Sequence, residues 1–112
     1  MTTPFASPYF FDKVFSAAGV VNIITPQQNR AGVKIERAYL CGEAASQCVL
    51  YVGSAAPLAF NDPTQRAIAI AQNGSQGIDS IIIPPDLGLW VAAGGTFTAT
   101  LTRGSGSYIF LK

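Results

Sequence analysis

Turns that contain glycine, proline and other turn-forming residues separate short extended segments about every ten positions in this sequence. The chain of 112 residues contains 11 glycines and seven prolines. No segment carries an apolar stripe with the spacing of an amphipathic helix. Residues 96–102 alternate strictly, with threonines on one face and Phe, Ala and Leu on the other. This period of two predicts a strand and indicates an all-β chain.

The turn residues divide the chain into eight to nine short strands. This number predicts a two-sheet antiparallel β-sandwich with jelly-roll or Greek-key-like connectivity. We expect residues 9–112 to form this single domain and residues 1–8 to form an N-terminal arm. The expected strands cover residues 9–16, 19–25, 33–41, 48–53, 66–72, 81–83, 87–93, 96–102 and 107–112.

Cys41 and Cys48 are the two cysteines of the chain. If residues 42–47 form a hairpin centred between Ala44 and Ala45, the two cysteines lie directly opposite each other. A cross-strand disulfide is then conceivable, whereas a reducing cytoplasm favours two neighbouring buried thiols. The C-x-x-C spacing of a redox motif is absent.

Charged residues are scarce, and this scarcity excludes several classes of function. They make up 12% of the chain, against roughly 25% in a typical soluble domain, and the chain has no histidine. Serine–histidine and cysteine–histidine catalysis and histidine metal sites are therefore excluded. The six carboxylates lie mostly beside predicted turns, which favours solvated positions over the catalytic pair of a glycosidase. We expect no enzymatic activity, no cofactor and no metal.

The net charge of +1 leaves no basic patch for nucleic acid or for an anionic membrane. No stretch approaches the roughly 18 apolar residues of a membrane span, and the first residues lack the pattern of a signal peptide. A surface with few charges favours association, and exposed edge strands need protection from uncontrolled pairing. We therefore expect a homo-oligomer made in a cytoplasm.

Three segments resemble small β-sandwich virion structural proteins of tailed bacteriophages. They are VKIERAYL (33–40), CVLYVG (48–53) and IIIPPDLGLWV (81–91), the last with the Ile-Pro-x-x-x-Gly-Leu turn that recurs in such proteins. The resemblance covers residues 19–112. It implies a head decoration or cement protein, a neck or tail component, or a module of a host-binding fibre. The implied location is the virion, after synthesis in the host cytoplasm. The implied partners are copies of the chain, as a trimer or hexamer, and virion proteins such as the major capsid protein.

The candidate interaction residues come from two regions. Aromatic side chains near the N-terminus are expected to reach a neighbouring subunit, and the threonine face is expected to offer an exposed hydroxyl ladder or an intersubunit sheet. The alternative function is a carbohydrate- or receptor-binding module, with Trp90 or tyrosines exposed, although a lone tryptophan in an apolar strand is more often a core residue. The interaction candidates are Phe5, Tyr9, Phe10, Phe11, Thr96, Thr98, Thr100 and Thr102.

Overall fold

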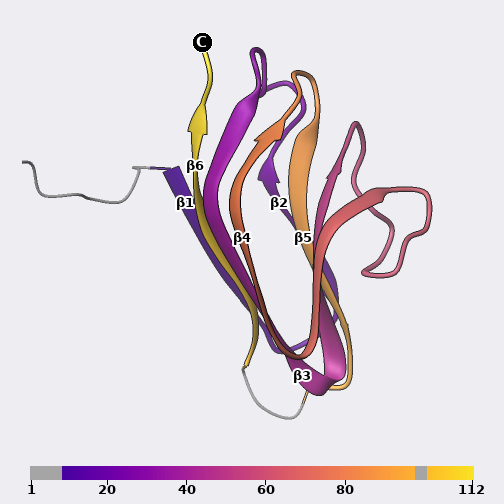
Figure 1. Ribbon diagram of the computed structural model, residues 1–112. Coiled ribbons are helices and arrows are strands. Elements are labelled where there is room, and N and C mark those ends of the chain that lie inside the picture. The colour runs from indigo at the N-terminus through magenta and orange to yellow at the C-terminus, as the bar shows by residue number, and fades with distance from the viewer. Residues whose placement is uncertain (1–8, 98–100) are drawn as a thin grey trace, which may run out of the picture.

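The computed structural model describes residues 9–97 and 101–112 (Figure 1). The predicted arm, with Phe5, and also Thr98 and Thr100 lie outside these residues. The predicted all-β class is confirmed, but the predicted eight to nine strands are not: the described residues contain six antiparallel strands, which form one curled sheet. The strands are β1 (Tyr9–Phe15), β2 (Gly19–Ile24), β3 (Val33–Gly53), β4 (Arg66–Ile83), β5 (Gly88–Gly95) and β6 (Thr102–Phe110).

Two long strands explain the lower number. β3 has 21 residues and β4 has 18, and each replaces two predicted strands. Gly42 of β3 lies opposite Gly74 of β4, so the two strands bend together. Asn73 and Gly74 take positive φ angles of 50° and 154° at this bend, a conformation that suits these residue types. The turn-forming residues thus bend continuing strands, and the predicted hairpin at Ala44 and Ala45 does not occur.

The bend divides the sheet into two halves with different neighbours. In the first half, residues 33–41 of β3 lie between β6 and residues 75–83 of β4, and β1 pairs with β6. In the second half, residues 47–53 of β3 lie between β5 and residues 66–72 of β4, and β2 pairs with β5. Figure 1 shows β3 and β4 running through both halves.

The inner faces of the two halves enclose one hydrophobic core. Phe11 and Leu40 of the first half belong to the same buried cluster as Leu50 and Val91 of the second half. Burying such side chains contributes about 1.5–3 kcal/mol each, so the bend is held by packing between the halves. Each half keeps an outer face that points away from this core.

A bulge in β3 decides which side chains reach the outer face of the first half. The pairing of β3 with β6 shifts register between Ile35 and Arg37, whereas the pairing of β3 with β4 keeps its register there. The opposing position in β4 is Ser80, which has a φ angle of 48°. Because a bulge inserts one residue into the alternation, Ile35 and Ala38 are both buried while Tyr39 is exposed.

Of the described positions in the strand predicted at residues 96–102, only Thr102 lies in a strand, as the first residue of β6. β5 ends at Gly95, and Thr96, Phe97 and Leu101 lie outside strands. The backbone N–H of Thr96 donates to the carbonyl oxygen of Ala45 at the bend of β3, at 2.9 Å. β5 pairs with β3 in the second half, whereas β6 pairs with β3 in the first half.

Candidate functional site

The outer face of the second half is covered by the chain itself. Residues 54–65 pass over it, and Phe60 packs against a cluster that includes Tyr51 and Trp90. The Tyr51 hydroxyl donates to the carbonyl oxygen of Phe60 at 2.6 Å. Trp90 is only 6% exposed, so its interpretation as a core residue is confirmed and it offers no platform for a sugar.

Asp62 holds the covering segment in place. Its Oδ1 accepts hydrogen bonds from the Thr64 hydroxyl at 2.6 Å and the Thr64 N–H at 2.9 Å. Its Oδ2 accepts one from the Leu58 N–H at 2.9 Å. These bonds, with the Thr64 hydroxyl foremost, lower the pKa of Asp62, because they stabilise its charged form. The segment is therefore ordered by its own carboxylate.

The outer face of the first half has no such cover among the described residues. Phe10 of β1 is 68% exposed and Tyr39 of β3 is 48% exposed. Tyr39 lies between two small residues on the adjacent strands, Ser105 of β6 and Gly77 of β4. Neither neighbour is large enough to cover the aromatic ring, which leaves it available to a ligand or a partner.

Two exposed ion pairs flank Tyr39 on this face. Arg103 Nη2 lies 2.8 Å from Oδ1 and 2.9 Å from Oδ2 of Asp12. Arg37 Nε lies 3.2 Å from Oδ1 of Asp79. Exposed pairs of this kind contribute little to stability, about 0–1 kcal/mol. Their main effect is that the four charges around Tyr39 sum to zero.

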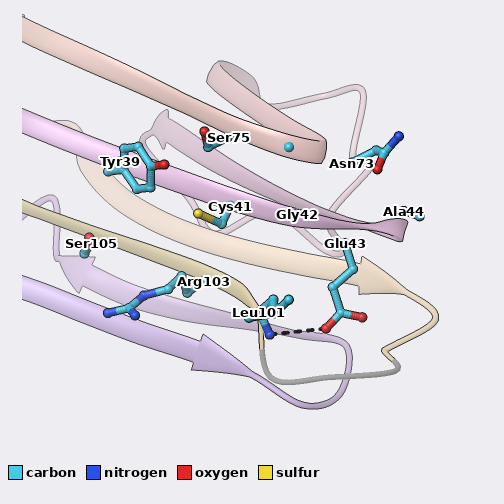
Figure 2. A pocket seen from close by; sticks show the side chains of 11 residues that line it. Tyr39, Cys41, Gly42, Glu43, Ala44, Asn73, Ser75, Leu101, Arg103 and Ser105 are labelled. Carbon is cyan, nitrogen blue, oxygen red and sulfur yellow. Dashed lines mark hydrogen bonds between the residues drawn. The ribbon is translucent and has the colours of Figure 1, made fainter.

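Two adjoining hollows lie on this face, and together we call them the outer groove. Their volumes are about 930 and 430 Å³, and both are lined by Tyr39, Arg103 and Ser105. Figure 2 shows Tyr39 beside Cys41 on β3, with Ser105 and Arg103 on the neighbouring strand. At the far end of the larger hollow, the Leu101 N–H donates to Glu43 Oε1 at 3.2 Å. The outer groove thus combines an aromatic ring with polar and charged groups.

The β4 strand forms an edge of the sheet in both halves. Among the described residues it pairs only with β3, and its sequence carries two charges, Arg66 and Asp79. Ile70 and Ile82 are 52% and 62% exposed. The Ile70 N–H donates to the Gln76 side chain at 3.0 Å. β4 is therefore a long edge with little of the charge that normally discourages strand pairing.

The two cysteines lie in the same strand and in different surroundings. Cys48 is fully buried in the core, whereas Cys41 is partly exposed in the outer groove. Burial, and to a lesser degree the nearby Cys41, raise the pKa of Cys48 to about 12. Both are free thiols, and the cross-strand placement on which a disulfide depended is wrong.

The five candidate residues that lie within the described ranges do not form one site. The ring of Tyr9 packs on those of Tyr108 and Phe110, with centroids 5.7 and 5.2 Å away. Phe10 reaches the outer groove and Thr96 is exposed at the bend. Phe11 and Thr102 are buried, and so offer no surface to a neighbour.

Asp12, Tyr39 and Arg103 were not among the interaction residues expected from the sequence. Asp12 stands opposite Ser105, which in turn stands opposite Tyr39, so these residues share a row across β1, β6 and β3. The alternation of Arg37, Tyr39 and Cys41 was the available signal. It did not distinguish the inner face from the outer, because that assignment depends on the bulge between Ile35 and Arg37.

Within residues 9–97 and 101–112, no group of three or more His, Cys, Asp or Glu side chains is placed to hold a metal ion. The same part of the chain contains no helix long and apolar enough to cross a membrane. No protein-family model, curated protein or solved structure matches the chain.

Proposed function

We propose that the chain is a non-enzymatic structural protein of a virus particle, a capsid decoration or cement protein or a tail or neck component. In this proposal it binds copies of itself and neighbouring virion proteins, such as the major capsid protein, through apolar contacts and strand edges. The observation that carries the proposal is the β4 edge, which has 18 residues and only two charges. An edge of this length invites pairing with another chain.

The arrangement of the edges favours a ring of subunits. β1 and β2 are the edge strands on one flank of the curled sheet, and β4 supplies the edges of both halves on the other flank. Contact between the β4 flank of one copy and the β1–β2 flank of the next is head-to-tail. Such contacts close into a ring when the rotation divides a full turn evenly, which accords with a trimer or hexamer on a virion symmetry axis.

Two isoleucines supply apolar area along the β4 edge. Ile70 lies in the second half and Ile82 in the first half, and each exposes more than half of its surface. Covering half an isoleucine side chain contributes about 1 kcal/mol. Backbone pairing adds to this contribution, because each edge N–H and C=O that pairs with a neighbour is satisfied within the assembly.

Two further observations support the virion proposal. The low charge content and absence of histidine suit a protein that functions by binding neighbours. The resemblance to small phage β-sandwich proteins spans most of the chain, and in this proposal the two halves act as the two layers of a jelly-roll-like sandwich. The core shared by both halves is compatible with that interpretation.

Charge placed on the β4 edge tests the proposal. Native proteins use edge lysines to prevent strand pairing, so the double variant Ile70→Lys, Ile82→Lys is expected to lower the native mass to that of a monomer. Leu58→Lys is the matched control, because Leu58 is 91% exposed but lies in the segment that covers the second half. An unchanged oligomer in the double variant would show that β4 is not the assembly edge.

A further inference from the structure

We propose that the outer groove binds a neutral oligosaccharide, with Tyr39 as the stacking surface and Asp12 and Arg103 as the partners of sugar hydroxyl groups. The proposed ligand follows from three features together: the exposed ring of Tyr39, the ion pair of Asp12 and Arg103, whose charges cancel, and the shallow groove. It does not depend on the proposed virion function.

Tyr39 has the surroundings of a stacking residue. It stands in the middle of β3, so its backbone is fixed by β6 on one side and by β4 on the other. Its cross-strand neighbours Ser105 and Gly77 are small, and the ring remains 48% exposed. A rigid aromatic ring pays little conformational entropy when it binds, and the apolar C–H face of a sugar needs no charge to pack against it.

Asp12 and Arg103 supply hydrogen-bonding groups beside Tyr39 on the same outer face. Asp12 is two strands away in the same row as Tyr39, which places the two backbones about 10 Å apart. The pair is held by bonds from Arg103 Nη2, and a guanidinium has five N–H donors in all. The half-exposed side chains therefore offer acceptors and donors together, as adjacent sugar hydroxyls require.

The charge balance selects a neutral ligand. Arg103 is paired with Asp12, and Arg37 is paired with Asp79. The positive charge of each arginine is therefore already balanced by a carboxylate. An anionic sugar or a nucleic acid strand would need unpaired basic groups along its path. A neutral polyhydroxylated ligand needs only the directed hydrogen bonds that these pairs provide.

The groove is long enough for more than one sugar ring. Phe10 is exposed on the same face and shares a row with Ser107 and Arg37. The strand spacing and rise place Phe10 roughly 12 Å from Tyr39, so the two rings can contact different units of one oligosaccharide. The two hollows of about 930 and 430 Å³ are comparable with small-molecule sites, which measure about 300–1,000 Å³.

The groove and the isoleucines of the proposed assembly edge involve different residues. The groove lies on the outer face of β1, β6 and β3 and also reaches residues 73–75 of β4 at the bend, whereas Ile70 and Ile82 do not line it. A ring of subunits joined at these isoleucines would leave Tyr39, Asp12 and Arg103 open on every copy. Sugar binding and oligomeric state can therefore be measured independently.

Saturation-transfer NMR on the full-length protein tests the inference. The probes are neutral trisaccharides of glucose, galactose, mannose and N-acetylglucosamine, with trigalacturonate as an anionic control. At least one neutral trisaccharide is expected to bind, and trigalacturonate is not. Tyr39→Ala and Asp12→Asn are each expected to weaken binding about tenfold, which corresponds to about 1.4 kcal/mol.

Matched variants separate binding from folding. Tyr39→Phe keeps the ring and is expected to retain most of the affinity, and Leu58→Ala is expected to leave it unchanged. Absence of binding to every neutral trisaccharide would overturn the inference, as would equal binding by Tyr39→Ala. If Tyr39→Ala instead changes the native mass and no sugar binds, the face is a subunit interface and the inference is also wrong.

Discussion

Asn29 and Pro84, 55 positions apart in the sequence, are joined by a hydrogen bond of 2.7 Å from Asn29 Nδ2 to the carbonyl oxygen of Pro84. The same Nδ2 donates to the Leu87 carbonyl at 2.8 Å, and Asn29 Oδ1 accepts from the Gly32 N–H at 2.8 Å. Asn29 is fully buried. The side-chain amide of Asn29 therefore joins the segment between β2 and β3 to the turn that precedes β5.

Replacement of Asn29 by aspartate is expected to destabilise the fold by about 2–4 kcal/mol. The carboxylate can still accept from Gly32, but it cannot donate to the Pro84 and Leu87 carbonyls, and it brings a buried charge. Chemical denaturation measures the loss. Gln27→Glu makes the same amide-to-acid change at an exposed position and should alter stability by less than about 0.5 kcal/mol. Equal effects of the two variants would contradict this role for Asn29.

Acidification is expected to release the segment that contains Asp62. Because folding lowers the pKa of Asp62 below its ordinary value of 3.8, the stabilisation is fully present above that value. It is lost as the pH falls through the lower native pKa. Trp90, the single tryptophan, lies under this segment, so its fluorescence should shift to the red below pH 3.8.

Asp62→Asn is the control for this pH dependence. Its amide cannot become charged, so the variant is expected to show the shifted Trp90 emission already at neutral pH and little further change on acidification. A variant that keeps the wild-type acid transition would show that another group controls the segment.

The two thiols are expected to differ sharply in reactivity. Only the thiolate attacks an alkylating reagent, and a pKa of about 12 for Cys48 leaves less than about one thiol in ten thousand ionised at pH 7.5. The native protein should therefore take up one equivalent of N-ethylmaleimide, at the partly exposed Cys41. Mass spectrometry counts the adducts. Rapid modification of a native Cys41→Ser variant would contradict the burial of Cys48.

The ring of Phe60 lies directly on Gly94, where a Cβ atom would overlap it. Gly94→Ala is therefore expected to displace the ring and to cost about 1–3 kcal/mol. In a Phe60→Ala background the same substitution should cost much less, because the overlapping ring is gone. A double-mutant cycle measures this coupling, and additive effects would show that the two residues do not interact.

The parts of the fold that could be predicted depend on local turn chemistry. The polar connection after β2 and the turn at Pro85 and Asp86 were both expected, and both occur between strands. Asn73 and Gly74 carry the same local signal, yet they bend β4 without ending it. Whether such residues reverse a strand or bend it depends on the partner strand, here β3, which the local sequence does not specify.

The candidate site was harder to predict because it depends on which face a side chain occupies. Phe10 and Phe11 are adjacent aromatics, but Phe10 is exposed and Phe11 is in the core. Thr102 belongs to an alternating threonine pattern, yet it is buried with its hydroxyl 2.6 Å from that of Ser46. The face that each side chain occupies depends on pairing between strands that are distant in the sequence. The periodicity of the sequence alone does not determine it.

The native mass of the full-length protein, measured by light scattering over a range of concentrations, tests the proposed assembly most directly. Flank-to-flank pairing along β4 predicts a closed trimer or hexamer that persists at low micromolar concentration and changes little with salt, because few charges lie at the edge. A monomer of 11.7 kDa at every concentration would contradict self-assembly through the sheet edges.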